Sequence, residues 1–244
     1  MPMEIVFETE YAGHKLRFAF QHPSTRLFFD ADIQAFLGEP DVKATEERIR
    51  CAAGKLPQGA KIGYVENQTL IGLAGQALLR YDCCIFHAVA FLWRGLAWLL
   101  SAPSGTGKST QYFNWQRLFP GEIEMISGDM PVLEARGDEG VFVHPSNWNG
   151  KEGVGGHGFA RLGGLVLLEQ GKENAISWVE AGDAVYPVLR QFVADLDTPE
   201  EIRRLAKLTE QVLLSAPVWK LVNLGDDAST RLLRRTLSVA LDPD

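Results

Sequence analysis

Cysteine and positive charge are both scarce in this 244-residue chain. Its three cysteines, Cys51 and the adjacent Cys83 and Cys84, are too few for a disulfide framework, and neighbouring residues rarely bridge without strain. We therefore expect reduced thiols in a cytoplasmic protein. Lys and Arg total 24 against 31 Asp and Glu, a net charge of −7, which argues against nucleic acid as a partner.

Segments typical of membrane spanning, secretion or repetition are also missing. The longest apolar stretch, residues 85–100, is interrupted by His87 and Arg94 and is too short and polar to cross a bilayer. The first ten residues are acidic and lack a basic n-region, so we expect no secretory signal and no membrane partner. No Cys/His spacing typical of zinc, no Gly-x-Ser-x-Gly elbow and no kinase His-Arg-Asp loop is present.

What the chain does contain is an ordinary globular composition, 46% hydrophobic and 23% charged. Residues 4–29 alternate as two half-buried strands do, with a turn at residues 12–14. Residues 38–62 are polar and predict a surface connection with a short exposed helix around 43–50. We expect residues 1–79 to form a strand-rich appendage to a larger domain over residues 80–244.

Patterns of both strand and helix follow in that larger part. Strands are expected at 85–93, 96–100, 123–127, 132–134, 141–143, 165–169 and 219–223, and helices at about 108–118, 199–214 and 227–241. Arg94-Gly95 would close a hairpin, and Thr198, Pro199 and Glu201 predict a capped helix start. The mixture of hairpins and helices predicts one α/β domain.

The most specific motif follows the strand 96–100. It fits the phosphate-loop pattern, with alanine replacing the first glycine, and comprises Ala102, Pro103, Ser104, Gly105, Thr106, Gly107, Lys108, Ser109 and Thr110. Small residues let backbone N–H groups face phosphates, Lys108 would reach the β- and γ-phosphates, and the Ser109 hydroxyl would bind Mg²⁺. The alternative is a Gly/Ser-rich turn with a chance lysine, but the strand before and the helix after it favour ATP or GTP binding.

Asp129 follows a predicted strand, twenty residues after Ser109. A second carboxylate at a strand end is what phosphoryl transfer needs beside Mg²⁺. The alternative is an ordinary turn aspartate, because Gly-Asp is common in turns.

His87 is placed by hairpin register: if Arg94-Gly95 is a two-residue turn, His87 lies opposite Ala102. The alternative is a satisfied histidine on a buried strand.

Together, the strand histidine, the phosphate loop and the strand ending in aspartate resemble the HPr kinase/phosphorylase family. They also resemble, more widely, the fold of phosphoenolpyruvate carboxykinases. The resemblance covers roughly residues 80–225. It implies a single mixed-sheet P-loop domain like the C-terminal fold of those enzymes, which bind ATP and phosphorylate a serine on a carrier protein. Related kinases modify peptides.

Carried over to this chain, the resemblance matches Lys108 and Ser109 to the phosphate lysine and magnesium serine, and His87 to the family's strand histidine. Asp129 matches one member of an adjacent aspartate pair, while Gly128 occupies the other position. One carboxylate must then serve as both metal contact and base, or another residue supplies the base. The reverse, phosphorolytic reaction is put in doubt for the same reason.

A second unusual loop lies at residues 148–158, with five glycines and a Lys151-Glu152 pair in eleven residues. In the family a charged, glycine-containing loop lies at the catalytic cleft, so the resemblance makes Lys151 and Glu152 candidates. The alternative is a solvated loop. Next to it, His157 is more readily read as an ordinary surface residue, and Arg161 as either that or a phosphate clamp.

We therefore expect an ATP- and Mg²⁺-dependent kinase that transfers the γ-phosphate to a hydroxyl of a protein, peptide or small molecule. Asp129, His87, Lys151, Glu152 and Arg161 are the catalytic candidates. The alternatives are a nucleotide-sensing module with reduced catalysis, favoured by the single carboxylate, and a carboxykinase-like lyase, whose extra metal ligands we do not find. The acceptor, the choice of ATP or GTP, and a homo-oligomeric state are left open.

Overall fold

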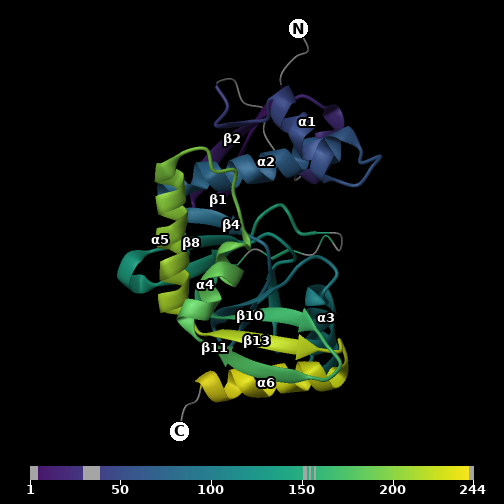
Figure 1. Cartoon of the computed structure of the whole chain (residues 1–244), viewed down its shortest axis with the longest axis vertical. Coiled ribbons are helices and arrows are strands. Elements are labelled where there is room, and N and C mark those ends of the chain that lie inside the picture. Colours follow the sequence, from purple (N-terminus) through teal and green to yellow (C-terminus); the bar gives the residue numbers. More distant parts are fainter. Residues whose placement is uncertain (1–4, 30–38, 151–152, 154, 157, 242–244) are drawn as a thin grey trace.

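The computed structural model describes residues 5–29, 39–150, 153, 155–156 and 158–241. Over these residues the chain is an α/β protein with a mixed sheet of ten strands and a separate three-stranded sheet. The small sheet lies at one end of the molecule and α6 closes the other (Figure 1). Among the described residues, no helix has the length and apolar character needed to cross a membrane.

The elements have the following bounds. The strands are β1 (Ile5–Tyr11), β2 (His14–Phe20), β3 (Val42–Lys43), β4 (Cys83–Phe86), β5 (Val89–Trp93), β6 (Leu96–Ser101), β7 (Glu124–Ser127), β8 (Val132–Ala135), β9 (Val141–His144), β10 (Ala160–Gln170), β11 (Ala175–Val179), β12 (Phe192–Val193) and β13 (Val218–Asn223). The helices are α1 (Glu46–Lys55), α2 (Ile62–Leu78), α3 (Lys108–Leu118), α4 (Ala181–Leu189), α5 (Pro199–Ser215) and α6 (Asp227–Leu241), with short 3₁₀ turns η1 (Pro23–Phe28), η2 (Leu79–Tyr81) and η3 (Gly137–Glu139).

The N-terminal elements share a hydrophobic core with the large sheet. β1 and β2 form the expected hairpin, and β3 adds to β2 in parallel. Phe7 and Phe18 of this hairpin belong to the same buried cluster as Ile85 of β4 and Val132 of β8. The predicted boundary after residue 79 falls inside η2, of which Tyr81 packs against this shared core.

Helix α2 was not expected from the sequence. It is buried on most sides, with polar residues such as Glu66 and Asn67 buried among small and apolar ones, so its sequence shows no helical periodicity. An added Cβ at Gly75 would lie 1.8 Å from the carbonyl oxygen of Val193, so glycine is what lets α2 approach β12 this closely. Between β3 and α2, the exposed helix predicted near 43–50 is α1, shifted to Glu46–Lys55.

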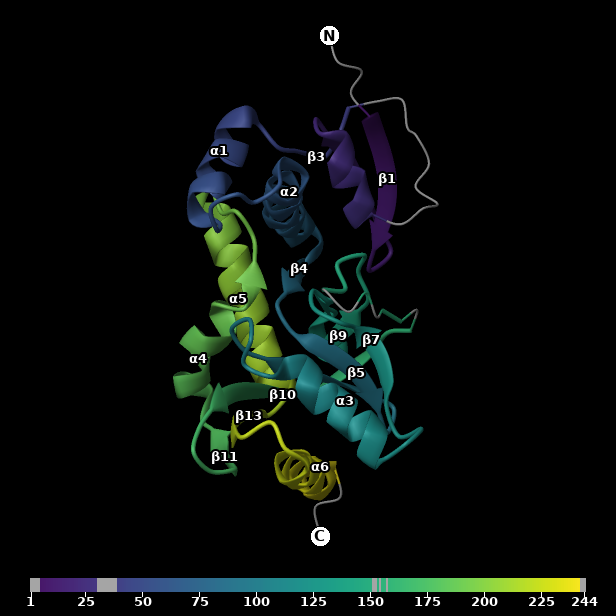
Figure 2. The same cartoon turned by 90° about the vertical axis from the view of Figure 1, so that its right-hand side faces the viewer.

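The large sheet has the order β12-β4-β8-β9-β10-β6-β5-β7, with β13 beside β10 and β11 beside β13. Pairing is parallel for β6–β10 and β10–β13, and antiparallel elsewhere in this sheet. The core formed by residues of α4 and α5 lies on one face, and the core formed by α3 and α6 on the other (Figures 1 and 2). With the cluster shared with the N-terminal hairpin, the large sheet therefore contributes to three buried hydrophobic clusters.

The single strand predicted at 85–93 is wrong in one respect, because the structure divides it at His87 and Ala88. β4 pairs with β8 and β12, whereas β5 pairs with β6 and β7, so the chain crosses between two parts of the sheet at this point. The β7–β8 connection makes the same crossing alongside, with the N–H of Ala88 donating to the carbonyl of Asp129 at 2.9 Å. His87 and Asp129 are thereby held next to each other.

Other expectations hold in detail. The hairpin register pairs Trp93 with Leu96 and Ala90 with Leu99, as predicted. The capping box at Thr198 and Glu201 is present at the start of α5, and α6 has the expected bounds. The strand at 165–169 is longer than predicted and begins at Ala160, because its first residues pair with β9. Helix α4 and strands β11 and β12 were not predicted.

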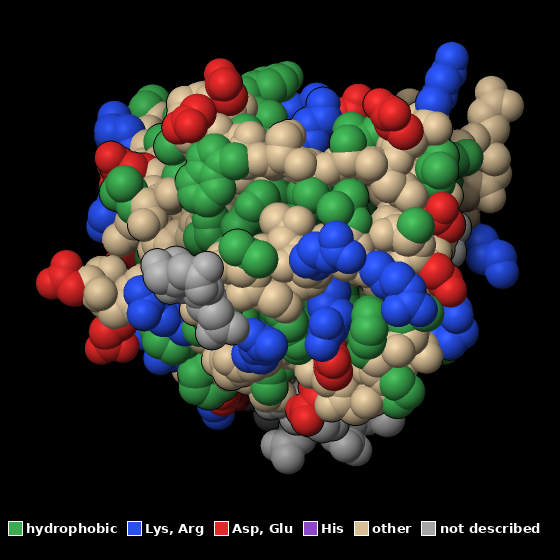
Figure 3. All heavy atoms as spheres, turned by 90° about the horizontal axis from the view of Figure 1, so that it is seen from below, with side chains coloured by type: hydrophobic (Ala, Val, Ile, Leu, Met, Phe, Trp, Pro, Cys, Tyr) green, Lys and Arg blue, Asp and Glu red, His purple; other side chains and the backbone are tan. Residues whose placement is uncertain are grey.

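The α6 end of the molecule carries several Lys and Arg side chains among hydrophobic ones (Figure 3). Two of the arginines near α6 are paired with acids. Arg117 of α3 contacts Asp227, and Arg234 contacts Glu122 at 2.7 Å. These pairs join α6 to α3 and to the turn before β7.

Candidate functional site

The phosphate-loop sequence connects β6 to α3, as the motif requires. Gly105 and Gly107 adopt φ values of +82° and +109°, which favour glycine, and Gly107 is the residue before the first turn of α3. Within the loop, the Thr106 hydroxyl donates to the carbonyl of Pro103 at 2.8 Å. Gln170, at the end of β10, donates to the carbonyl of Gly105 at 3.2 Å. The loop is thus held from both sides at the positive end of a helix.

Lys108 begins α3 and is buried, with 7% of its surface exposed. Its Nζ donates to the carbonyl of Ala102 at 2.9 Å and lies 2.9 Å from Nε2 of His87. A buried lysine normally needs such partners, because an ammonium removed from water is costly. The side chain therefore folds back across the loop toward the β4–β5 crossing.

His87 lies between the loop and Asp129. Its Nε2 is 3.3 Å from Oδ1 of Asp129, and the two side chains are 21% and 30% exposed. The backbone holds this position, because the N–H of His87 donates to Gln191 at 2.7 Å and its carbonyl accepts from the Ser101 hydroxyl at 2.7 Å. His87 therefore lies beside the phosphate-loop sequence, 2.9 Å from Lys108, but the predicted pairing with Ala102 is absent from the β5–β6 ladder. The β5–β6 ladder itself ends at Val89 and Leu100, before His87.

A cavity of about 780 Å³ opens beside Lys108 and Asp129. Its floor is the start of α3 and the Gly128-Asp129 turn, and its far wall comes from η1 and α2. The described lining residues are Leu27, Phe28, Phe29, Tyr64, Asn67, Gln68, Ile71, Ser104, Gly105, Gly107, Lys108, Ser109, Thr110, Gly128, Asp129, Met130, Asn147, Trp148, Asn149, Gly150 and Gly153. Among them, Lys108 and Asp129 are the charged side chains.

The cavity wall is built from aromatic and amide side chains that belong to no sequence motif. Trp148 is buried, stacks on Tyr11 with ring centres 5.3 Å apart, and donates from Nε1 to Oδ1 of Asn67 at 3.1 Å. Asn149 accepts from the N–H of Gly128 at 3.4 Å. Polar residues scattered through a buried helix give no motif, so Asn67 and Gln68 could be found only from the fold.

The wall is anchored by Glu66, which is fully buried. Its carboxylate accepts from the N–H of Gln21 at 2.7 Å, the N–H of His22 at 3.0 Å and the Thr25 hydroxyl at 2.6 Å. These three bonds tie the chain before and within η1 to α2. They fix the segment that carries Leu27 and Phe28 over the cavity.

The remaining predicted residues are placed differently. Ser104, Ser109 and Thr110 line the cavity with Lys108. Arg161 does not join them. It is exposed at the start of β10, its guanidinium lies beside Gly140 of the β8–β9 connection, and it is not among the described residues that line the cavity. Lys151, Glu152 and His157 lie outside the described residues.

The residues around the cavity are of the types that could hold a nucleoside triphosphate with Mg²⁺. A helix N-terminus preceded by two glycines in the left-handed region offers backbone N–H groups to an anion. Ser109 and Asp129 supply oxygen ligands of the type Mg²⁺ prefers, and both line the same cavity as Lys108. Gly150 lies against Asp129, where an added Cβ would be 3.1 Å from that of the aspartate.

No protein-family model and no curated protein matches the chain.

Proposed function

We propose that this protein is an ATP- and Mg²⁺-dependent kinase that transfers the γ-phosphate to a hydroxyl acceptor, with a fold related to that of the HPr kinases. The observation that carries the proposal is the meeting of Lys108, His87 and Asp129 near the start of α3, with Lys108 and Asp129 lining one cavity. A phosphate-binding cation, a histidine and a carboxylate at a helix N-terminus are the groups that phosphoryl transfer uses.

The position of the site in the sheet also supports the proposal. Ligands of α/β proteins bind where strand connections diverge to different parts of a sheet. Here the β4–β5 and β7–β8 connections cross together, and β6 delivers the phosphate loop to the same place. The β4–β5 connection therefore contributes His87, the β7–β8 connection contributes Asp129, and the loop after β6 leads to Lys108.

In the proposed reaction the phosphates lie along residues 104–110, and Lys108 exchanges Ala102 and His87 for phosphate oxygens. Ser109 and Asp129 would hold Mg²⁺, which supplies positive charge to the phosphate oxygens when bound. The acceptor oxygen forms a bond to the γ-phosphorus as the bond to the β–γ bridging oxygen breaks, and ADP leaves. Asp129 accepts the proton of the acceptor hydroxyl.

His87 would position Lys108 and Asp129. Its Nε2 can accept from Lys108 or, when it carries a proton, donate to Asp129, but it cannot do both. Movement of Lys108 onto a phosphate frees this nitrogen to donate to Asp129. That bond would hold the carboxylate in place for the acceptor hydroxyl.

A specific observation favours a second candidate, a nucleotide-binding module with reduced catalysis. Gly128, not a second carboxylate, precedes Asp129, and its N–H is taken by Asn149. In this alternative the loop binds nucleotide, and the cavity responds to it without transferring phosphate.

Labelled transfer separates the two candidates. The chain is incubated with γ-labelled ATP, Mg²⁺ and cell extract, and the products are divided into macromolecular and small-molecule pools. The kinase proposal expects one pool to be labelled by the natural chain and by Lys55→Ala, a substitution of an exposed lysine in α1, but not by Lys108→Ala. Nucleotide binding with neither pool labelled would favour the binding module.

A further inference from the structure

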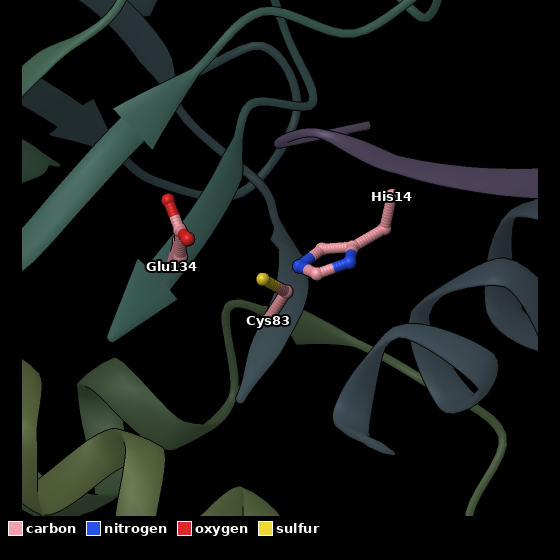
Figure 4. A group of neighbouring side chains, drawn as sticks. All are labelled: His14, Cys83 and Glu134. Atoms are coloured by element: carbon pink, nitrogen blue, oxygen red, sulfur yellow. The ribbon is translucent and has the colours of Figure 1, made fainter. Parts of the chain in front are cut away.

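A second cluster of reactive side chains lies away from the cavity, between the small sheet and the large one. His14, Cys83 and Glu134 place one ligand atom each within 4.8 Å of one another. They come from β2, β4 and β8, three strands widely separated in the sequence (Figure 4). The imidazole of His14 points toward the sulfur of Cys83, and Glu134 faces that sulfur from the opposite side.

We propose that these three residues form a site for a zinc-class divalent cation. A thiolate, an imidazole and a carboxylate are the ligand set of Zn²⁺, and sulfur and nitrogen ligands disfavour Mg²⁺ and Ca²⁺. Three protein ligands leave a fourth coordination position for water. From within 4.8 Å of one another, the three atoms would draw closer to meet a tetrahedral ion with bonds of about 2.0–2.3 Å.

Among the described residues, neighbouring side chains orient Glu134 but contact only one of its two carboxylate oxygens. Arg136 and His144 contact the carboxylate of Glu134 at 2.8 Å and 2.7 Å. All of these described contacts end on Oε2, which leaves Oε1 for a cation. Such outer hydrogen bonds are typical of metal ligands, because they hold the ligating carboxylate in place.

The other two ligands are also positioned. The His14 ring stacks on Tyr81, with centres 4.1 Å apart and planes within 7°. The Cys83 thiol donates to the carbonyl of Tyr81 at 3.3 Å. Zinc would bind this sulfur as a thiolate, so binding releases the thiol proton to solvent.

A bound cation would join the two sheets. His14 belongs to the β1–β2 hairpin, whereas Cys83 and Glu134 are paired neighbours of β4 and β8 in the large sheet. Because the cation binds only when these strands are assembled, it stabilises the packing of the small sheet on the large one. This effect is independent of the kinase proposal, since His14, Cys83 and Glu134 are not among the described residues that line the cavity.

The test uses the full chain, with ZnCl₂ and CoCl₂ as probes and with neither nucleotide nor Mg²⁺ present. Isothermal calorimetry is expected to show one zinc ion per chain. His14→Asn and Cys83→Ser should each weaken that binding by about a hundredfold or more, since even the loss of an outer-shell partner costs about 10–100-fold. Cys51→Ser is the matched control, since Cys51 is an exposed thiol on α1, and it should bind zinc as the natural chain does.

Cobalt distinguishes this site from any other carboxylate or histidine on the chain. The natural chain and Cys51→Ser should show a sulfur-to-cobalt charge-transfer band in the near ultraviolet, and Cys83→Ser should lose it. Zinc should raise the melting temperature of the natural chain but not that of His14→Asn, a change on the partly exposed edge of the cluster that keeps Cys83 in place. Absence of zinc binding, unchanged binding in both ligand variants, or a cobalt complex without the sulfur band would overturn the proposal.

Discussion

Nζ of Lys108 lies 2.9 Å from Nε2 of His87, although 21 positions separate the two residues in the sequence. Nε2 of His87 also lies 3.3 Å from Oδ1 of Asp129. One imidazole nitrogen therefore faces a cation on one side and a carboxylate on the other. This arrangement couples the residue expected to bind phosphate to the residue expected to take the acceptor proton.

Lys108→Ala should weaken binding of Mg²⁺-ATP by at least tenfold, about 1.4 kcal/mol. Among the described residues lining the cavity, Lys108 is the one cationic side chain, so no neighbour can replace its charge on the phosphates. Calorimetry with the natural chain, the variant and the exposed-lysine control Lys55→Ala measures the difference. Equal affinity in all three would contradict the phosphate-loop interpretation.

His87→Ala should lower phosphoryl transfer by about tenfold or more, which corresponds to about 1.4 kcal/mol in the barrier. The reason is that Asp129 loses the ring nitrogen at 3.3 Å that would hold its carboxylate. The Michaelis constant for ATP should change less than the turnover number, and His87→Gln should recover part of the loss. A variant with normal turnover but a lowered melting temperature would instead show His87 to be an ordinary core histidine.

Glu66→Ala should destabilise the chain by about 2–4 kcal/mol, because three hydrogen-bond donors lose their common acceptor in a buried position. Glu66→Gln keeps one carbonyl oxygen and should cost less. Urea denaturation followed by circular dichroism gives both values. If neither variant differs from the natural chain, the bonds between Glu66 and the η1 region do not hold the cavity wall.

Acid should remove the contribution of the Glu122–Arg234 pair. The Arg234 guanidinium, which donates to both carboxylate oxygens at 2.7 Å, holds the pKa of Glu122 below its ordinary value of 4.5. The folded chain thus binds this proton less tightly than the unfolded chain. The stabilisation is present above pH 4.5 and is lost as the pH falls through the lowered pKa.

Glu122→Gln should accordingly cost about 1 kcal/mol or less at neutral pH, as expected for a partly exposed pair. The difference from the natural chain should shrink as the pH is lowered below 4.5 and through the depressed pKa of Glu122. Denaturation midpoints across this range measure the effect. A difference that stays constant with pH would mean that Arg234 does not lower the pKa of Glu122.

The parts of the fold that could be predicted carry local signals. The capping box at Thr198, the phosphate loop and the Arg94-Gly95 turn each lie within a few residues, so the sequence alone identifies α5, the start of α3 and the β5–β6 hairpin. The turn also sets the β5–β6 register as far as Val89 and Leu100, where the ladder ends before His87.

The remaining features depend on contacts between distant residues. Helix α2 is buried on most sides, so the polar face that normally marks a surface helix is missing. The break at His87 follows from β4 pairing with β8 and β12, strands that are distant in the sequence. For the same reason Asn67, which holds Trp148 at the cavity wall, has no motif. The cluster of His14, Cys83 and Glu134 likewise shows none of the regular spacing of a zinc motif.

Asp129→Asn, compared with the natural chain in parallel assays of Mg²⁺-ATP binding and labelled phosphate transfer, tests the kinase account most directly. Backbone N–H groups, Lys108 and the α3 N-terminus bind phosphates without this carboxylate, so affinity should stay within about a few-fold. Transfer should fall by about 10² or more. The asparagine amide keeps the shape of the carboxylate, but it has no negative charge to hold the metal and cannot accept the proton of the acceptor hydroxyl. Near-normal transfer by Asp129→Asn, or no transfer to any pool by the natural chain, would contradict the account.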